Sequence, residues 1–317
     1  MGSVNADEKT LPRWRSFMLS FSDAWKVLQA NDPLRLAAAT AFFTTFALPA
    51  ILVIIIQLLR LVFRIQHVGR RLMAALEAQF GRETADAVTH TLRAFRSLTQ
   101  NWIISIAGFL FLLFVATTLF KIIKGSINQL WQVKSVKKES FRQIMRSRLR
   151  GVLVIIFAGL LFVLDIIAEA AKGFLGKYIE VYVPAMSFYY NSALSYLIQV
   201  LVVTVWFYIV FFFIPDARPR FKPGIVGALV TGILFTAGKL LLRILLNYSS
   251  INTIYGASAS TVLLLLFMFY SSMIFYFGAA FTHAWSARRG MPVVPLPNAG
   301  YYEVTTATAD SNMLKES

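Results

Sequence analysis

Six long apolar stretches dominate this chain of 317 residues and limit what it can fold into. A helix needs roughly 20 apolar residues to cross a bilayer core of about 30 Å. Each stretch therefore predicts a membrane-spanning helix, and the expected fold class is all-α: a polytopic membrane protein with six transmembrane helices and additional amphipathic interfacial helices. The predicted spans are Ala37–Leu59, Trp102–Ile123, Val152–Ala168, Ala193–Ile214, Gly224–Leu246 and Ala259–Trp285.

The composition supports a membrane protein and excludes several kinds of site. Hydrophobic residues make up 57% of the chain and charged residues 15%, against about 25% charged residues in soluble domains. The chain has no cysteine and only three histidines, which excludes disulfide frameworks, thiolate metal sites and histidine-rich metal clusters. We therefore expect no catalytic residue, no metal and no cofactor.

The net charge of +16 sets the expected orientation. Nucleic acid is not the expected partner, because most lysines and arginines lie in loops between apolar stretches, where they orient membrane proteins. With the N-terminus inside, the inside segments carry about twice as many basic residues as the outside ones. Both termini are therefore expected in the cytoplasm, in a multi-pass membrane protein.

The segments outside the spans have patterns of their own. The loop 60–101 predicts two amphipathic helices at the outer interface, since its apolar residues recur at helical spacing. Residues 1–36 predict a cytoplasmic segment with another interfacial helix, the six-helix domain occupies 37–285, and the tail 286–317 is expected to be disordered. The apolar stripe of the first interfacial helix is Leu11, Trp14, Phe17, Phe21, Trp25 and Leu28.

Ionisable residues within spans are functional candidates, because their insertion costs about 2.5–3.5 kcal/mol each. Asp165 and Glu169 of the third span, and Lys239 and Arg243 of the fifth, are i, i+4 pairs at matching depth in the outer half of the membrane. One hypothesis pairs Asp165 with Lys239 and Glu169 with Arg243 along a polar cavity. Alternatively, the bases extend to the outer headgroups, or the charges form a purely structural ion pair.

Two further features have both a functional and a structural interpretation. The basic loop 124–151 attracts anionic lipid headgroups or merely fixes the topology. The small residues of the fifth span allow close helix packing, which we favour over a substrate groove. The candidate lipid contacts are Lys134, Lys137, Lys138, Arg142, Arg146, Arg148 and Arg150, and the candidate packing positions are Gly227, Ala228, Gly232 and Gly238.

Several motifs resemble the YihY/BrkB family of bacterial inner-membrane proteins, historically labelled as ribonuclease BN. They are the opening helix from Ala37 through Pro49, then Phe213-Ile214-Pro215-Asp216, Tyr255-Gly256-Ala257-Ser258 and Phe277-Gly278-Ala279-Ala280-Phe281-Thr282. The resemblance implies six membrane helices and matches Gly238-Lys239 to a Gly-Lys of the family. It also implies a glutamate at the position of Ala280, and the role of that carboxylate does not carry over.

The resemblance implies a transporter or flippase-like protein for a lipid or envelope precursor, with anionic membrane lipids as partners. A non-transporting scaffold that binds envelope proteins through the outer helices of residues 66–99 is the alternative. An intramembrane enzyme would depend on Asp165 and Glu169. Ribonuclease activity is not expected, because hydrolysis needs an acid cluster for a metal or a histidine pair, and neither pattern occurs.

Overall fold

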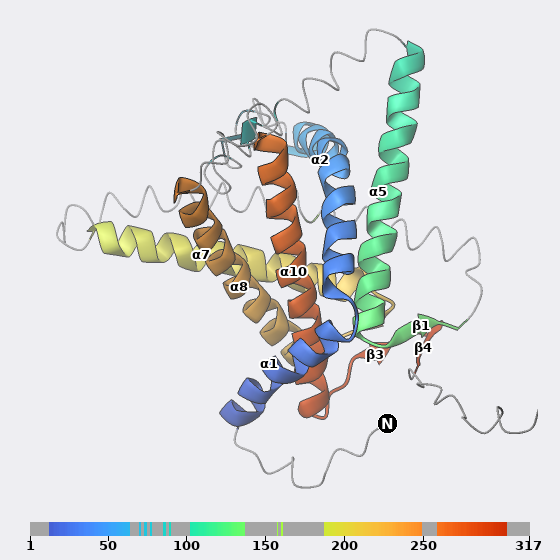
Figure 1. Cartoon of the computed structure of the whole chain (residues 1–317), viewed down its shortest axis with the longest axis vertical. Coiled ribbons are helices and arrows are strands. Elements are labelled where there is room, and N and C mark those ends of the chain that lie inside the picture. Colours follow the sequence, from blue (N-terminus) through green and yellow to red (C-terminus); the bar gives the residue numbers. More distant parts are fainter. Residues whose placement is uncertain are drawn as a thin grey trace, which may run out of the picture.

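The computed structural model describes residues 13–63, 102–136, 187–248 and 259–302, together with isolated positions between them. Six helices and four short strands lie in these segments (Figure 1). The helices are α1 (Arg13–Gln29), α2 (Pro33–Phe63), α5 (Trp102–Leu130), α7 (Ser187–Phe213), α8 (Phe221–Tyr248) and α10 (Ala259–Arg288). The strands are β1 (Val133–Ser135), β2 (Ala217–Arg218), β3 (Val294–Pro295) and β4 (Ala299–Tyr301).

Five of the six expected spans coincide with helices, and the third, Val152–Ala168, lies outside the described segments. Within the described residues, three helices are long and apolar enough to cross a membrane: Tyr196–Phe213, Phe221–Leu242 and Val262–Arg288. The helices α2 and α5 have 31 and 29 residues. An apolar helical membrane protein is thus established, whereas the count of six spans stays a prediction.

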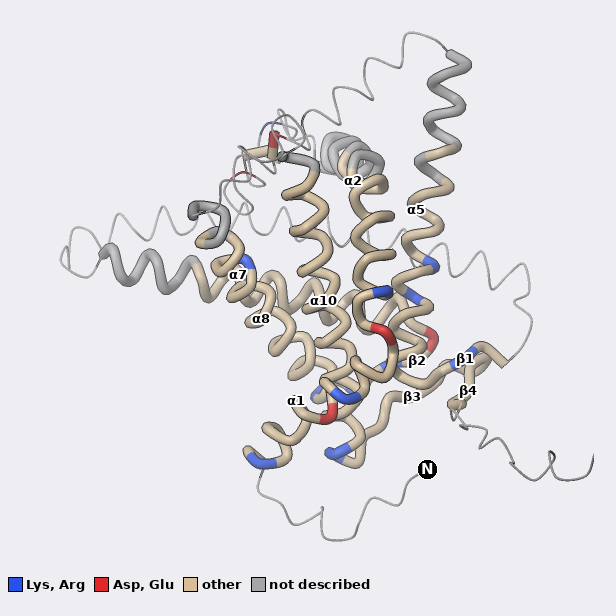
Figure 2. Tube along the Cα trace, in the orientation of Figure 1, with Lys and Arg blue, Asp and Glu red and all other residues tan. Residues whose placement is uncertain are grey.

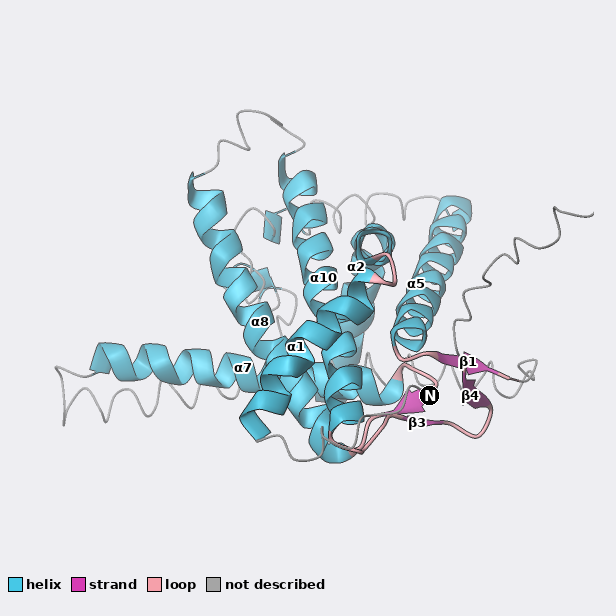
Figure 3. Ribbon diagram, turned by 60° about the horizontal axis from the view of Figure 1, so that its bottom comes forward, coloured by secondary structure: helices cyan, strands magenta, loops and turns pink. Residues whose placement is uncertain are grey.

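The central helix of the described structure is α10, which contacts α1, α2, α5 and α8. Its aromatic side chains fill the core: Tyr276 and Phe281 are fully buried, and Phe275 stacks on Phe207 and Phe211 of α7. The hydroxyl of Tyr276 also forms a buried hydrogen bond of 2.5 Å with Thr40 of α2. In two views α7 lies across α8, whereas α5 and α10 stand upright (Figure 3).

The apolar stripe of α1 is divided between two environments. Phe17 and Phe21 make ring contacts with Phe281 of α10, and Leu28 is buried. Trp14 and Trp25 remain 68% and 52% exposed. The helix was expected from its periodicity, but only part of its stripe faces away from the protein, because the phenylalanines pack on the end of α10.

The turn between α1 and α2 follows from its polar residues. Pro33 is the first residue of α2, as its fixed φ favours. Asp32 has a positive φ of 50° and accepts a backbone hydrogen bond from Leu36. The side chain of Asn31 donates to the carbonyl of Val27 at 2.7 Å, so it caps the end of α1 rather than the start of α2.

The expectation of a disordered tail from residue 286 was wrong for residues 286–302, because α10 continues to Arg288 and two strands follow it. Strand β3 pairs antiparallel with β2, and β4 pairs antiparallel with β1. Val293 is buried. Composition suggested a polar, proline-rich tail, but backbone hydrogen bonds to segments after α5 and α7 order it. Residues 303–317 lie outside the described segments.

Most described lysines and arginines gather at one end of the molecule (Figure 2). The end of α5, the start of α8, the end of α10 and the strands meet there. We call it the basic end, defined by Lys124, Lys134, Arg218, Arg220, Lys222, Arg288 and Arg289. By the positive-inside rule, this is the end expected to face the cytoplasm.

Candidate functional site

Lys239 is a buried cation within the apolar part of α8. Its side chain is 6% exposed, and it lies inside the candidate span Phe221–Leu242. Its Nζ donates a hydrogen bond of 3.2 Å to Oε1 of Gln199 on α7. This contact pairs a charged group with a neutral amide at a depth where apolar side chains predominate.

Gly238, the residue before Lys239, allows α8 to pack closely against α10 at the depth of Lys239. A Cβ on Gly238 would lie 2.8 Å from the Cδ1 of Ile274 and 3.0 Å from the Cε2 of Tyr270, both on α10. The neighbouring Lys239 meets α7 instead, because consecutive helical residues are about 100° apart. The side of α8 at Gly238 is therefore closed by α10, and α7 supplies the polar partner for Lys239.

Polar atoms of α10 lie close to this level. The hydroxyls of Tyr270 and Ser271 are buried and have no hydrogen-bond partner within the described structure. The ring of Tyr270 is one of the groups against Gly238. We define the intramembrane polar site as Lys239 and Gln199, whereas Tyr270 contacts the other side of α8, at Gly238.

Farther toward the basic end, α8 and α10 interlock through two Gly-xxx-Thr pairs. A Cβ on Gly227 would lie 1.9 Å from the Oγ1 of Thr282, and a Cβ on Gly278 would lie 1.9 Å from the Oγ1 of Thr231. Each threonine donates its hydroxyl hydrogen to the carbonyl of the glycine four residues earlier, at 2.7 Å for Thr231 and 2.8 Å for Thr282. The antiparallel helices can approach this closely only because both positions lack a side chain.

The other small residues of α8 are also packed. Gly232 lies against α7, where an added Cβ would meet the Oγ1 of Thr204 at 2.7 Å. Ala228 is fully buried in the core. Glycines of this one helix therefore contact two neighbours, α10 at Gly227 and Gly238 and α7 at Gly232.

At the basic end, Asp216 joins α5 to the segment after α7. Its Oδ2 lies 3.0 Å from Nζ of Lys124 and accepts a hydrogen bond of 2.9 Å from Nδ2 of Asn128. Its backbone N–H donates to Oδ1 of Asn128 at 2.8 Å. Lys124 and Asn128 are i, i+4 on α5, so they present both partners on one face. Asp216 was recognised from the sequence only as part of a family motif, and the i, i+4 spacing of Lys124 and Asn128 is the signal that could have indicated its partners.

The proposed charge ladder falls largely outside the described structure. Asp165 and Glu169 lie in the segment that is not described, and Arg243 lies on α8 with no described side chain. The pairing of Asp165 with Lys239 and of Glu169 with Arg243 therefore remains a prediction.

Most of the candidate lipid contacts of the basic loop are likewise not described. Lys134 is exposed on β1. The outer helices of the loop 60–101 are described only at isolated positions. Outside the described segments lie Lys137, Lys138, Arg142, Arg146, Arg148 and Arg150.

The apolar helices and the buried polar residues within them define a helical integral membrane protein. The family model described as "Virulence factor BrkB" matches residues 24–299, and the chain belongs to this family. The match agrees with the resemblance to the YihY/BrkB family expected from the sequence motifs.

Curated relatives are also membrane proteins. The chain is 24% identical over 285 residues to a "UPF0761 membrane protein" of Chromohalobacter salexigens, covering 87% of this chain and 65% of that protein. It is 26% identical over 294 residues to a "UPF0761 membrane protein" of Teredinibacter turnerae, covering 88% of this chain and 64% of that protein. The match thus spans slightly less than two thirds of these relatives. No solved structure matches the chain.

Proposed function

We propose that this protein transports or flips an anionic amphiphile, a lipid or an envelope precursor, across the membrane, with Lys239 contacting the headgroup. The observation that carries the proposal is the burial of Lys239 beside Gln199 within an apolar helix. A charged residue inside a span is costly by about 2.5–3.5 kcal/mol on insertion scales and marks functional sites more often than chance positions.

The chemistry of the intramembrane polar site matches an anionic headgroup. Gln199 orients the ammonium through its amide oxygen, whereas the lysine brings a full positive charge to that depth. Phosphate and carboxylate oxygens accept strong, charge-assisted hydrogen bonds from an ammonium group.

The outer surface of α8 suits the apolar part of such a ligand. Leu229, Ile233 and Leu241 are exposed large apolar side chains on this helix. In the proposed mechanism the acyl chains stay in the surrounding lipid along such a surface, while the headgroup passes the level of Lys239 and Arg243. This division keeps the charged group within protein and the chains within hydrocarbon.

Native mass spectrometry of the protein extracted with its own lipids tests this function. We expect wild type to retain a specific anionic lipid or lipid-linked sugar and Lys239→Met to lose it. Lys121→Met is the matched control, because Lys121 is exposed on α5. Equal retention by wild type and Lys239→Met at equal abundance of folded protein would contradict the proposal.

The alternative is a membrane scaffold that binds an envelope protein through the outer helices of residues 66–99. It predicts a different outcome of the same experiment: no specific lipid is retained by wild type, and an envelope protein is co-purified instead. Loss of that protein on deletion of 66–99, with Lys239 intact, would favour the scaffold over the transporter.

A further inference from the structure

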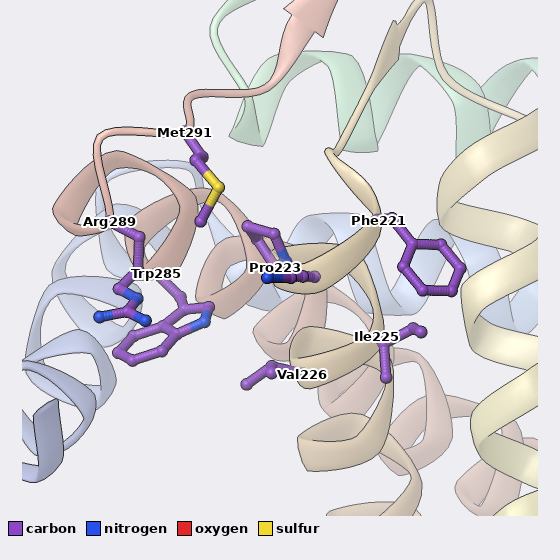
Figure 4. Close-up of a pocket in the computed structure, with 8 residues that line it drawn as sticks. Phe221, Pro223, Ile225, Val226, Trp285, Arg289 and Met291 are labelled. Atoms are coloured by element: carbon purple, nitrogen blue, oxygen red, sulfur yellow. The ribbon is translucent and has the colours of Figure 1, made fainter.

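A pocket at the basic end has an almost wholly apolar surface, and two basic residues are among those that line it. It lies between the first turns of α8 and the last turns of α10 and has a volume of about 360 Å³ (Figure 4). Phe221, Val226 and Trp285 contribute apolar surface, and Met291 from the segment after α10 lies on one side. The two basic side chains are Lys222 and Arg289, and none of the lining residues is acidic.

The basic residues of this pocket differ from neighbouring basic residues in whether they form ion pairs. Arg288 forms an ion pair with Asp23, and Lys124 forms one with Asp216. In the described part of the chain, no ion pair of Lys222 or Arg289 is found, and both residues are exposed. The guanidinium of Arg289 lies over the ring of Trp285 at 5.2 Å, which holds it at the rim.

The position of the pocket points to a lipid rather than to a water-soluble ligand. It lies where two candidate spans end, Phe221–Leu242 at its first residue and Val262–Arg288 at its last. At such a boundary a lipid places its phosphate at the level of basic side chains and its chains along apolar ones. The N-terminal end of α8 adds partial positive charge on the same side.

We propose that this pocket binds the headgroup of an anionic phospholipid, such as phosphatidylglycerol, from the leaflet at the basic end. Lys222 and Arg289 bind the phosphate, while Phe221, Val226 and Met291 contact the glycerol and the upper acyl chains. The proposal goes beyond transport: it describes a site about 25 Å along α8 from Lys239 (17 residues at about 1.5 Å each) and holds whether or not Lys239 carries a substrate.

The test is native mass spectrometry of the purified full-length protein titrated with phosphatidylglycerol, phosphatidylcholine and free glycerol phosphate. Wild type is expected to bind phosphatidylglycerol more tightly than phosphatidylcholine and to show no binding of glycerol phosphate at matched concentrations. The double variant Lys222→Gln/Arg289→Gln should weaken phosphatidylglycerol binding by about 25-fold, since each basic residue near an anionic lipid surface contributes about fivefold.

Two further variants keep the test decisive. Lys26→Gln/Arg35→Gln removes the same charge from two exposed positions outside the pocket and should change binding by less than about twofold. Met291→Trp fills the pocket without changing its charge and should also lose phosphatidylglycerol. If the double charge variant fails to fold, Met291→Trp still tests the proposal.

Three results would overturn the proposal. The first is that the pocket variant and the charge-matched control lose phosphatidylglycerol binding equally. The second is that Met291→Trp binds phosphatidylglycerol as tightly as wild type, and the third is that wild type binds glycerol phosphate as tightly as the lipid. The last result would indicate a site for free anions. Lys239→Met is expected to keep phosphatidylglycerol bound here and to lose only the additional lipid held at Lys239. The two proposals therefore predict the loss of different bound lipids from different variants, so that their failures can be distinguished.

Discussion

Replacing Gly278 with alanine should separate α8 from α10. The new Cβ would lie 1.9 Å from the Oγ1 of Thr231, 2.7 Å from its Cγ2 and 2.8 Å from its Cβ. Favourable contacts between carbon atoms lie at about 3.5–4.0 Å, so the helices must move apart by more than about 1 Å. The same movement would loosen the reciprocal contact of Gly227 with Thr282.

Two opposing terms set the size of the effect. Overpacking of this kind costs about 1–3 kcal/mol, and a clash below 2 Å with a helix-bound side chain belongs at the upper end. Alanine regains about 0.8–1.0 kcal/mol of helix propensity relative to glycine. We therefore expect Gly278→Ala to lower the free energy of unfolding by about 1–2 kcal/mol, which for a chain of 317 residues corresponds to a fall in Tm of about 2–3 °C.

The measurement is thermal unfolding in one detergent, followed by circular dichroism and by recovery of monodisperse protein. Gly125→Ala is the control, because a Cβ at Gly125 on α5 meets no atom within 4 Å. It should leave Tm unchanged or raise it. The double variant Gly278→Ala/Thr231→Ala should recover part of the loss, since it removes the two closest atoms. If Gly278→Ala melts at or above Gly125→Ala, the interlock of α8 and α10 does not exist as described.

Two other contacts give predictions of the same kind. Asp216→Asn weakens the ion pair with Lys124 and should cost about 1–3 kcal/mol, as expected for loss of a charge-assisted hydrogen bond in a largely buried setting; an unchanged Tm would contradict this role. Trp131→Phe removes the buried hydrogen bond of 2.9 Å from the indole N–H to the carbonyl of Ala279. It should lower Tm by an amount equivalent to about 1–2 kcal/mol. Trp14→Phe, the control at an exposed position, should leave Tm unchanged.

The helices could be predicted from apolar length, and their ends from local signals. The fifth span was expected from Gly224 and the helix begins at Phe221, three residues earlier. Hydropathy identifies only the apolar part of a helix. The first turn of α8, which carries Lys222, is also helical, but the charge of Lys222 keeps its mean hydropathy low, so the prediction started too late. Pro33, by contrast, marks the first residue of α2 because proline fixes its own backbone.

The packing of α1 and the course of the tail could not be predicted from the sequence. An amphipathic stripe shows that a helix has an apolar face, but not whether phenylalanine or tryptophan will contact protein. Phe17 packs on α10 while Trp14 remains exposed. Strands β3 and β4 are two and three residues long, which is too short for an alternating pattern, and their pairing depends on partners far along the chain.

The candidate site was predicted in part. The sequence singled out Lys239 together with Arg243 as an i, i+4 pair of bases within an apolar stretch. The structure shows that Lys239 is buried on α8, whereas its pairing with Asp165 stays a prediction. Gln199 was missed, because a neutral amide in an apolar stretch carries no charge signal and its partner lies 40 residues away. Lys222 and Arg289 were missed as a pair because each belongs to a different loop in the sequence and the fold brings those loops to one end.

The central claim is that Lys239 acts on an anionic amphiphile within the membrane, and one transport measurement tests it most directly. Wild type and Lys239→Met are reconstituted at equal folded abundance into vesicles that carry a fluorescent anionic lipid in the inner leaflet, and its appearance in the outer leaflet is followed by chemical quenching. Methionine is close to lysine in volume, but Lys239→Met leaves Oε1 of Gln199 without this donor, which is why the two proteins are compared at equal folded abundance. The account predicts lipid movement by wild type and by the exposed control Lys121→Met and none by Lys239→Met, whereas equal movement by wild type and Lys239→Met would contradict it.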